Sequence, residues 1–183
     1  MRGAIGNAIL MNIVLTFIFI FFMLLIGSIA YSRAYNVNRY LVDRVTSMAE
    51  DYDKGDGLKK FFNKDSNVRA WNNMVNPQLQ KAGYYLSNVS NTCPKPNVLG
   101  SSMYDSTGAT ELIWDTKAGA YDYCIYQIRL YEKNQDDDNL TKKRFYYRVI
   151  SYARFDFPLI GGFIKMPIKG ETRTIIKFKN QAS

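Results

Sequence analysis

The sequence predicts an α+β protein in which one long N-terminal helix packs against a small antiparallel β-sheet. An uncharged apolar run occupies residues 8–30, and apolar residues then recur every three or four positions up to residue 52. The last third of the chain instead alternates with a period of two, which is typical of strands. At 183 residues, the part that follows the apolar run has the size of one compact domain.

Residues 8–30 are long and apolar enough to form a transmembrane helix. Only Asn12, Thr16 and Ser28 place polar side chains in this run, and it contains no charge. About 20 apolar residues rising 1.5 Å each match a hydrocarbon layer of about 30 Å. A cleavable signal peptide has a shorter apolar stretch of roughly 7–15 residues. We therefore expect a tail over residues 1–7 and a single-pass helix whose partner is the lipid bilayer.

Beyond the membrane, the helix is expected to continue as an amphipathic helix over residues 31–52. No proline or glycine pair interrupts its apolar stripe, which favours packing against the chain's own head, with a contact to another subunit as the alternative. Asn12 is a candidate for hydrogen bonding to a neighbouring helix, or for a polar residue that reaches the membrane surface. The candidate assembly and helix-packing positions are Asn12, Thr16, Tyr31, Tyr35, Leu41 and Val45.

Residues 53–183 are expected to form a surface-exposed α+β head. A helix is predicted over residues 68–82, ended by Gly83 and kinked or divided at Pro77. Little regular structure is expected over residues 88–108. Strands are predicted over residues 121–131, 144–156 and 168–178; the first two form a hairpin around a polar turn at residues 135–139, and the third completes the sheet. One apolar face of this sheet then covers the apolar face of the helix.

Two observations about compartment conflict. More arginines follow the apolar run than precede it, which by the positive-inside rule indicates a cytoplasmic head: Arg2 lies before the run, and Arg33, Arg39 and Arg44 lie after it. Cys93 and Cys124 both lie in the head, which favours a disulfide in an oxidising compartment, with reduced core thiols as the alternative. We give the cysteines and the Tyr-, Thr-, Asn- and Ser-rich head more weight, and expect the head on the extracytoplasmic side of the cell membrane.

The residue types present argue against most chemistry. The chain has no histidine, and two cysteines are too few for a four-ligand zinc site. The net charge of +8 is scattered and matches no nucleic-acid-binding module. The Asp136–Asp138 run lacks the spaced ligands of a calcium loop. We therefore expect no enzyme, cofactor, metal or nucleic acid; a Ser–Lys hydrolase, which has no obligatory short motif, is a minor alternative.

Features at both ends of the chain coincide. Gly3 and Gly6 precede the apolar helix, and the polar segment Tyr31–Tyr35 follows it. Residues 152–173 read as an aromatic strand, a proline-bounded apolar turn and a last strand. Together these features resemble TadE-like pseudopilins, although residues 53–119 carry no part of the resemblance.

The resemblance implies a pilin-like fold and a non-catalytic structural subunit of a pilus or pilus-like surface or secretion apparatus. Its implied partners are other pilin-like membrane subunits or, in a homo-oligomer, copies of the same chain, and its implied processing sites are Gly3 and Gly6. One departure concerns the Glu that follows the processed glycine by five residues in pilins, because Ala8 or Met11 stands there. The alternative function is an anchored extracytoplasmic binding or sensor domain whose tyrosine-rich sheet contacts a ligand.

Overall fold

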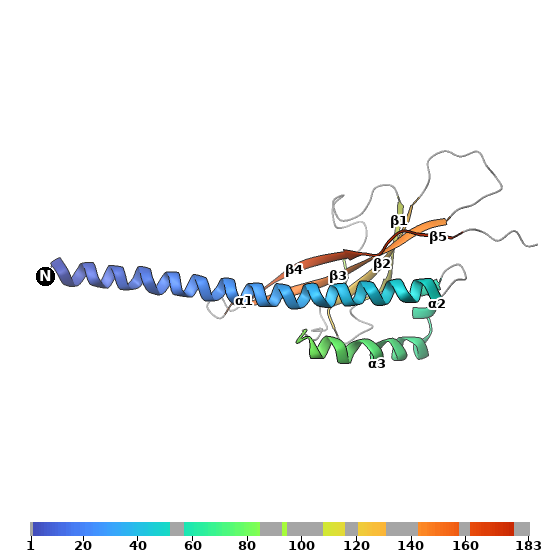
Figure 1. The fold of residues 1–183 in the computed structure, drawn as a ribbon, viewed down its shortest axis with the longest axis horizontal. Helices are drawn as coiled ribbons and strands as arrows, with labels where there is room; N and C mark the ends of the chain where they lie inside the picture. Colours follow the sequence, from blue (N-terminus) through green and yellow to red (C-terminus); the bar gives the residue numbers. More distant parts are fainter. Residues whose placement is uncertain are drawn as a thin grey trace, which may run out of the picture.

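Helix α1 runs through the length of the molecule and carries the other described elements on its C-terminal half (Figure 1). The computed structural model describes residues 2–51, 57–84, 93–94, 108–115, 121–130, 143–157 and 162–177. The elements are α1 (Arg2–Asp51), α2 (Gly57–Phe62), α3 (Asp65–Lys81), β1 (Gly108–Trp114), β2 (Tyr123–Leu130), β3 (Lys143–Phe157), β4 (Gly162–Glu171) and β5 (Ile175–Lys177). The expected α+β layout, a long apolar helix with a small antiparallel sheet, is confirmed.

The two halves of α1 have different surroundings. The helix is unbroken from Arg2 to Asp51, as its lack of proline predicts. From Ala30 onward one side of it is buried at a spacing of three or four residues, which is the stripe of an amphipathic helix: Ala30, Ala34, Val37, Leu41, Val45 and Ala49. The head that begins at residue 53 in the sequence therefore shares one core with the C-terminal half of α1.

The five strands form one antiparallel sheet in the order β1-β2-β3-β4, with β5 also paired to β3. The predicted hairpin between β2 and β3 is confirmed, with Tyr123 opposite Ser151 and Leu130 opposite Arg144. Alternate residues face α1 and α3 on the inner side, where the buried set includes Tyr123, Ile125, Phe145, Tyr147, Val149, Ser151 and Ala153. The outer side carries the smaller cluster of Cys124, Tyr126 and Ile150.

Two strand predictions need correction. Strand β1 was not expected, because a bulge between Leu112 and Trp114 disturbs its alternation: Leu112 packs with the outer cluster, whereas Ile113 and Trp114 both pack with the inner one. The single run predicted over residues 168–178 is wrong, since β4 begins at Gly162 and pairing is interrupted at residues 172–174 before β5. At the interruption, the Thr172 hydroxyl accepts the Tyr147 N–H at 3.0 Å in place of a backbone carbonyl.

The helices of the head also differ from the sequence prediction. Helix α3 begins at Asp65 and continues through Pro77 without dividing. Pro77 and Asn73 are both exposed, so water can bind the carbonyl that the proline leaves unbonded. Gly83 ends the segment with φ of +66°, as predicted. The short α2 was missed, and the predicted turn at residues 135–139 and nearly all of residues 88–108 lie outside the described residues.

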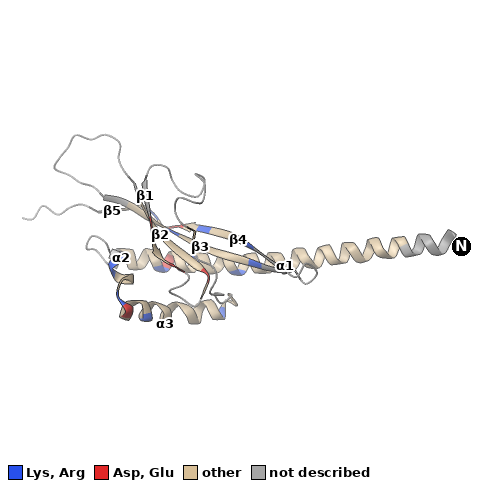
Figure 2. Cartoon of the chain, turned by 180° about the vertical axis from the view of Figure 1, so that it is seen from behind, with Lys and Arg blue, Asp and Glu red and all other residues tan. Residues whose placement is uncertain are grey.

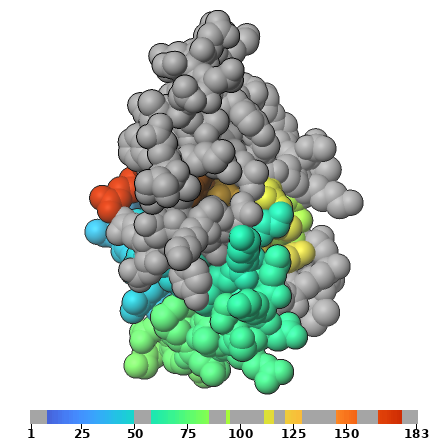
Figure 3. Space-filling model, turned by 90° about the vertical axis from the view of Figure 1, so that its right-hand side faces the viewer, coloured from blue at the N-terminus to red at the C-terminus, as the bar shows by residue number. Residues whose placement is uncertain are grey.

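The helices form a layer on the inner side of the sheet. Viewed from the end of the head, the residues of α2 and α3 form a continuous surface beside α1 (Figure 3). Trp71 of α3 is buried and donates its indole N–H to the Tyr123 hydroxyl at 2.6 Å. The edge-on ring of Phe62 from α2 packs on Trp71, with centroids 5.3 Å apart. These aromatic contacts tie α2 and α3 to the sheet that α1 also covers.

Two polar contacts set the position of α1 along the sheet. The buried Asn38 amide donates to the carbonyls of Val149 and Ile168, both at 3.0 Å. One turn nearer the N-terminus, the Ser151 hydroxyl donates to the Ala34 carbonyl at 3.1 Å. An apolar helix face allows sliding, whereas buried donors and acceptors must find their partners. These bonds therefore specify one alignment of α1 on the sheet.

Gly170 permits this close approach. It lies opposite Val149 on β4, directly under α1. A Cβ at residue 170 would collide with Asn38 Oδ1 and would lie 2.7 Å from Val42 Cγ2. Only a residue without a side chain leaves room for the Asn38 amide.

We predict that Gly170→Ala destabilises the chain by about 1–3 kcal/mol, because α1 must move away from β4 to admit the methyl group. Denaturant unfolding of the detergent-solubilised chain measures the loss. Lys169→Ala, at the exposed neighbouring position, is the matched control and should change stability little. In combination with Asn38→Ala, the Gly170→Ala loss should shrink, because the colliding amide is gone; equal losses at residues 169 and 170 would contradict this account.

Candidate functional site: the projecting apolar helix

The N-terminal half of α1 projects from the head as a bare apolar rod. Between Ile9 and Ile29, the large apolar side chains exposed by the fold range from 40% accessible at Phe19 to 71% at Phe17. Figure 2 shows no charged residue on the described part of this projection. Met23 and Gly27 are half-buried. The rest of this surface has no covering element among the described residues.

Such a surface requires an apolar environment. Removing one Leu, Ile or Phe side chain from water is worth about 1.5–3 kcal/mol, so exposure of the whole rod in water would be strongly unfavourable. The helix is long and apolar enough to cross a membrane, and its most apolar window is not buried by the head. The same half of the helix contains Asn12 and Thr16, both exposed; the Thr16 hydroxyl donates to the Asn12 carbonyl at 2.8 Å and so needs no other acceptor.

The remaining candidate assembly residues separate into two groups. Tyr31 and Tyr35 are 48% and 51% exposed, and their rings stack with centroids 6.4 Å apart. Leu41 and Val45 are instead fully buried in the core of the head. The sheet occupies their side of α1, so in this structure Leu41 and Val45 pack within the chain's own head, as the stripe favoured. Gly3 and Gly6 lie within the first turns of α1.

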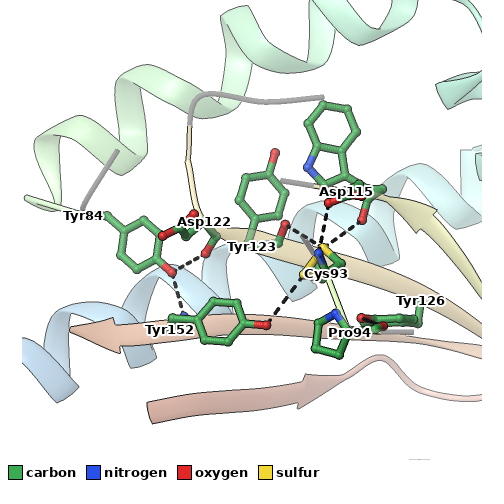
Figure 4. The surroundings of a disulfide bond; sticks show 10 residues. Tyr84, Cys93, Pro94, Asp115, Asp122, Tyr123, Tyr126 and Tyr152 are labelled. Atoms are coloured by element: carbon green, nitrogen blue, oxygen red, sulfur yellow. Dashed lines mark hydrogen bonds between the residues drawn. A yellow bond between two sulfur atoms is a disulfide. The ribbon is translucent and has the colours of Figure 1, made fainter. Parts of the chain in front are cut away.

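A disulfide holds the outer side of the sheet. Cys93 and Cys124 are bonded, with their Cα atoms 5.8 Å apart, as the sequence led us to expect (Figure 4). The Cys93 N–H donates to Asp115 Oδ1 at 3.1 Å, and the Tyr126 hydroxyl donates to the Pro94 carbonyl at 2.7 Å. These bonds fix residues 93–94 over the outer cluster.

A second polar group ties the end of α3 to the sheet (Figure 4). The Tyr84 hydroxyl donates to the Asp122 carbonyl at 2.6 Å and accepts the Tyr152 N–H at 2.7 Å. Burial raises the pKa of the Tyr84 hydroxyl, so it keeps the proton that it donates. Lys165 pairs with Asp122 at 2.8 Å, and the Asp122 side chain is almost fully enclosed.

Most of the described tyrosines of the sheet are enclosed, whereas the alternative function needs them exposed; Tyr152 is half-buried. Tyr121, Tyr123, Tyr126, Tyr146 and Tyr147 are all buried. Burial also raises the pKa of Tyr123, whose ring stacks on Trp114 with centroids 5.8 Å apart. Their role in the described structure is to fill the core. Among the described residues, no group of three or more acidic or cysteine side chains is placed to hold a metal ion.

We predict that breaking the disulfide lowers stability by about 3–4 kcal/mol, because the bond closes a loop between residues 31 positions apart in the chain. Denaturant unfolding with and without a reductant measures the loss. The double variant Cys93→Ser, Cys124→Ser should match the reduced protein and respond to no reductant. Equal stability of the oxidised and reduced protein would show that the bond contributes nothing.

We predict that two arginines in the rod, Phe17→Arg with Phe21→Arg, detach the chain from membranes. Each arginine near the middle of a span costs about 2.5–3.5 kcal/mol. Alkaline extraction of membranes measures the fraction that stays with the lipid. The control places the same charges on exposed α3 positions, Asn73→Arg with Met74→Arg, and should stay in the membrane pellet; equal retention of both variants would contradict a membrane span.

Comparison with protein-family models, with curated proteins and with solved structures gave no match to this chain.

Proposed function

We propose that this chain is a membrane-anchored, non-catalytic structural subunit of a pilus or pilus-like surface apparatus, of the pseudopilin or minor-pilin kind. The observation that carries the proposal is the continuity of α1, whose 50 residues serve first as a bare apolar rod and then as the spine of the head. A tethered binding domain functions when joined to its membrane helix by a flexible linker, whereas an assembling subunit benefits from a head that is fixed relative to its membrane helix. The resemblance of both chain ends to TadE-like pseudopilins supports the same proposal.

The exposed surface of α1 suits lateral association. The rod presents large apolar side chains together with Asn12, whose amide can bond a neighbouring helix within lipid. Tyr31 and Tyr35 continue the exposed surface alongside the head. The partners are then other membrane helices of this kind, or copies of this chain, packed around residues 9–35.

The sheet edge at β4 is poorly suited to assembly. The backbone N–H of Thr172 donates to the Tyr147 carbonyl at 2.9 Å. Along an antiparallel strand, successive residues direct their backbone groups to opposite sides, so Ile168 and Gly170 also direct theirs toward β3. Pro167 falls at an outward-facing position, where a further strand would require an N–H that proline lacks. Association through helices rather than through strand addition is consistent with this edge.

The disulfide supports an extracytoplasmic head. A buried Cys93–Cys124 bond persists in an oxidising compartment and is rare in a reducing cytoplasm. The arginines that follow the rod oppose this orientation by the positive-inside rule. We give the bond more weight, because it is part of the folded core, whereas Arg33 and Arg39 are exposed residues.

We predict that single cysteines on the rod cross-link to a copy of the chain or to another small membrane protein in native membranes. Both native cysteines are bonded, so Phe17→Cys or Leu24→Cys introduces the only free thiol. When the cysteine is moved along the rod, the adduct yield should rise and fall every three to four residues, because only one side of the rod faces the neighbour. Gel mobility and mass spectrometry of the adduct identify the partner.

The matched control for this cross-linking is Val45→Cys, on the same helix but buried in the head. It should form no adduct. If the cysteines on the rod also form none, while the chain remains in the membrane, then the chain is an isolated anchor and the subunit proposal is wrong.

A further inference from the structure

The contacts between α1 and the sheet show which residues of β3 lie beside which residues of α1. Asn38 bonds Val149, and Ala34 bonds Ser151, so two residues along β3 match four residues back along α1. The lengths agree, because two strand residues span about 6.6 Å and four helix residues about 6 Å. Continued in the same direction, Ala153 lies level with Ala30, and Phe157 lies level with Phe22, next to Met23.

Burial along α1 follows this correspondence. Met23 and Gly27 are the half-buried residues of the otherwise exposed rod, and they extend the stripe of Ala30 and Ala34. Figure 1 likewise shows the ends of β3 and β4 beside the middle of α1, beyond the rest of the head. The head therefore overlaps the apolar rod by about seven residues of helix, or about 10 Å.

The overlapping stretch of α1 remains apolar on its free sides. Leu24 is 68% exposed, and Leu25, Ile26 and Ile29 are also exposed. Immersing these side chains in lipid is favoured by about 1.5–3 kcal/mol each. Because the strand ends lie level with the same stretch of helix, immersing it brings the strand ends to the membrane as well.

We propose that the paired ends of β3 and β4, residues 154–157 and 162–165, form a second membrane contact that sits in the lipid headgroup layer beside α1. This strand-pair tip rests on the proposed membrane anchoring of α1 and adds a point of attachment to it. One helix alone leaves a head free to rotate about the helix axis, whereas a second contact beside it fixes which side of the head faces the bilayer.

The backbone of the tip indicates that it lies in the headgroup layer and not in the hydrocarbon core. The β2–β3 register ends at Tyr123 opposite Ser151, whereas β3 and β4 stay paired to Phe157 opposite Gly162. Among the described residues, the tip is thus a ribbon of two strands with open outer edges. Open edges are excluded from the hydrocarbon core but are satisfied by water and headgroups at the interface. The interface is about 5–7 Å deep on each side, so most of the overlap of about 10 Å can lie within it.

The Lys165 side chain points away from the membrane, toward the head. Lys165 lies opposite Arg154, beyond the level of Ala30, but its ammonium bonds Asp122 at 2.8 Å on the head side. The same ammonium lies 5.7 Å from the centre of the Tyr152 ring. A lysine whose stem crosses an apolar level while its charge points toward the polar side is the arrangement expected at a membrane surface. The tip residues Phe155, Phe157, Phe163 and Ile164 are apolar in sequence, whereas Arg154 and Asp156 limit how deeply it can enter.

Spin labels on the full-length chain in vesicles of phosphatidylcholine and phosphatidylglycerol test the proposal. Phe163→Cys places a label on the tip, and Lys169→Cys places one on the same face of β4, about 20 Å nearer the head. Phe17→Cys reports on the rod about 10 Å deeper than the level of the tip. Accessibility of each label to oxygen and to a water-soluble nickel chelate is compared, with thermal unfolding used to confirm that each variant folds.

We expect the label at residue 163 to lose nickel accessibility and gain oxygen accessibility relative to residue 169, reaching values between those of residues 169 and 17. A label at residue 163 that matches residue 169, with residue 17 buried in lipid, would overturn the tip contact and leave the anchor intact. A value at residue 163 equal to that at residue 17 would overturn the headgroup depth. If the label at residue 17 is itself open to the nickel chelate, the membrane anchor fails as well.

Discussion

The alignment of α1 on β3 and β4 is the constraint on which the rest of the structure depends. Asn38 and Ser151 supply the hydrogen bonds between helix and sheet, and Gly170 supplies the space for them. Apolar contact alone would hold the helix against the sheet at many offsets of similar energy, because hydrophobic attraction has no direction. The polar contacts select one offset, and that offset decides where the head ends along the apolar rod.

This alignment links two environments through one element. The C-terminal half of α1 is stabilised by the core of the head, and its N-terminal half by the apolar surroundings that its side chains require. Because the helix is unbroken, a displacement of the head is transmitted directly to the rod. That rigidity is the mechanical reason for proposing an assembling subunit, and it is also why the level of the strand ends is set relative to the membrane.

Prediction from the sequence succeeded where the pattern was local. The period of the stripe identified α1, alternation identified β2 and β3, and Gly83 marked the end of α3. It failed where a tertiary contact changed the pattern: the bulge between Leu112 and Trp114 hid β1, and the Thr172 hydroxyl divided one expected strand into β4 and β5. Pro77 was expected to kink or divide α3, but the helix continues through it, and its exposed position made the lost hydrogen bond tolerable.

By itself, the sequence determined that α1 has an apolar segment long enough for a membrane and a segment with an apolar stripe suited to a core. Both are visible in the sequence because they depend only on the order of apolar and polar residues. It also supplied both cysteines without stating that they pair. Only the tertiary structure decided that Leu41 and Val45 are buried while Tyr31 and Tyr35 are exposed, because each kind of residue lies on the same helix and only the sheet selects a side. It likewise decided that the sheet tyrosines fill the core, since burial depends on which layers cover a strand and not on the strand's own residues.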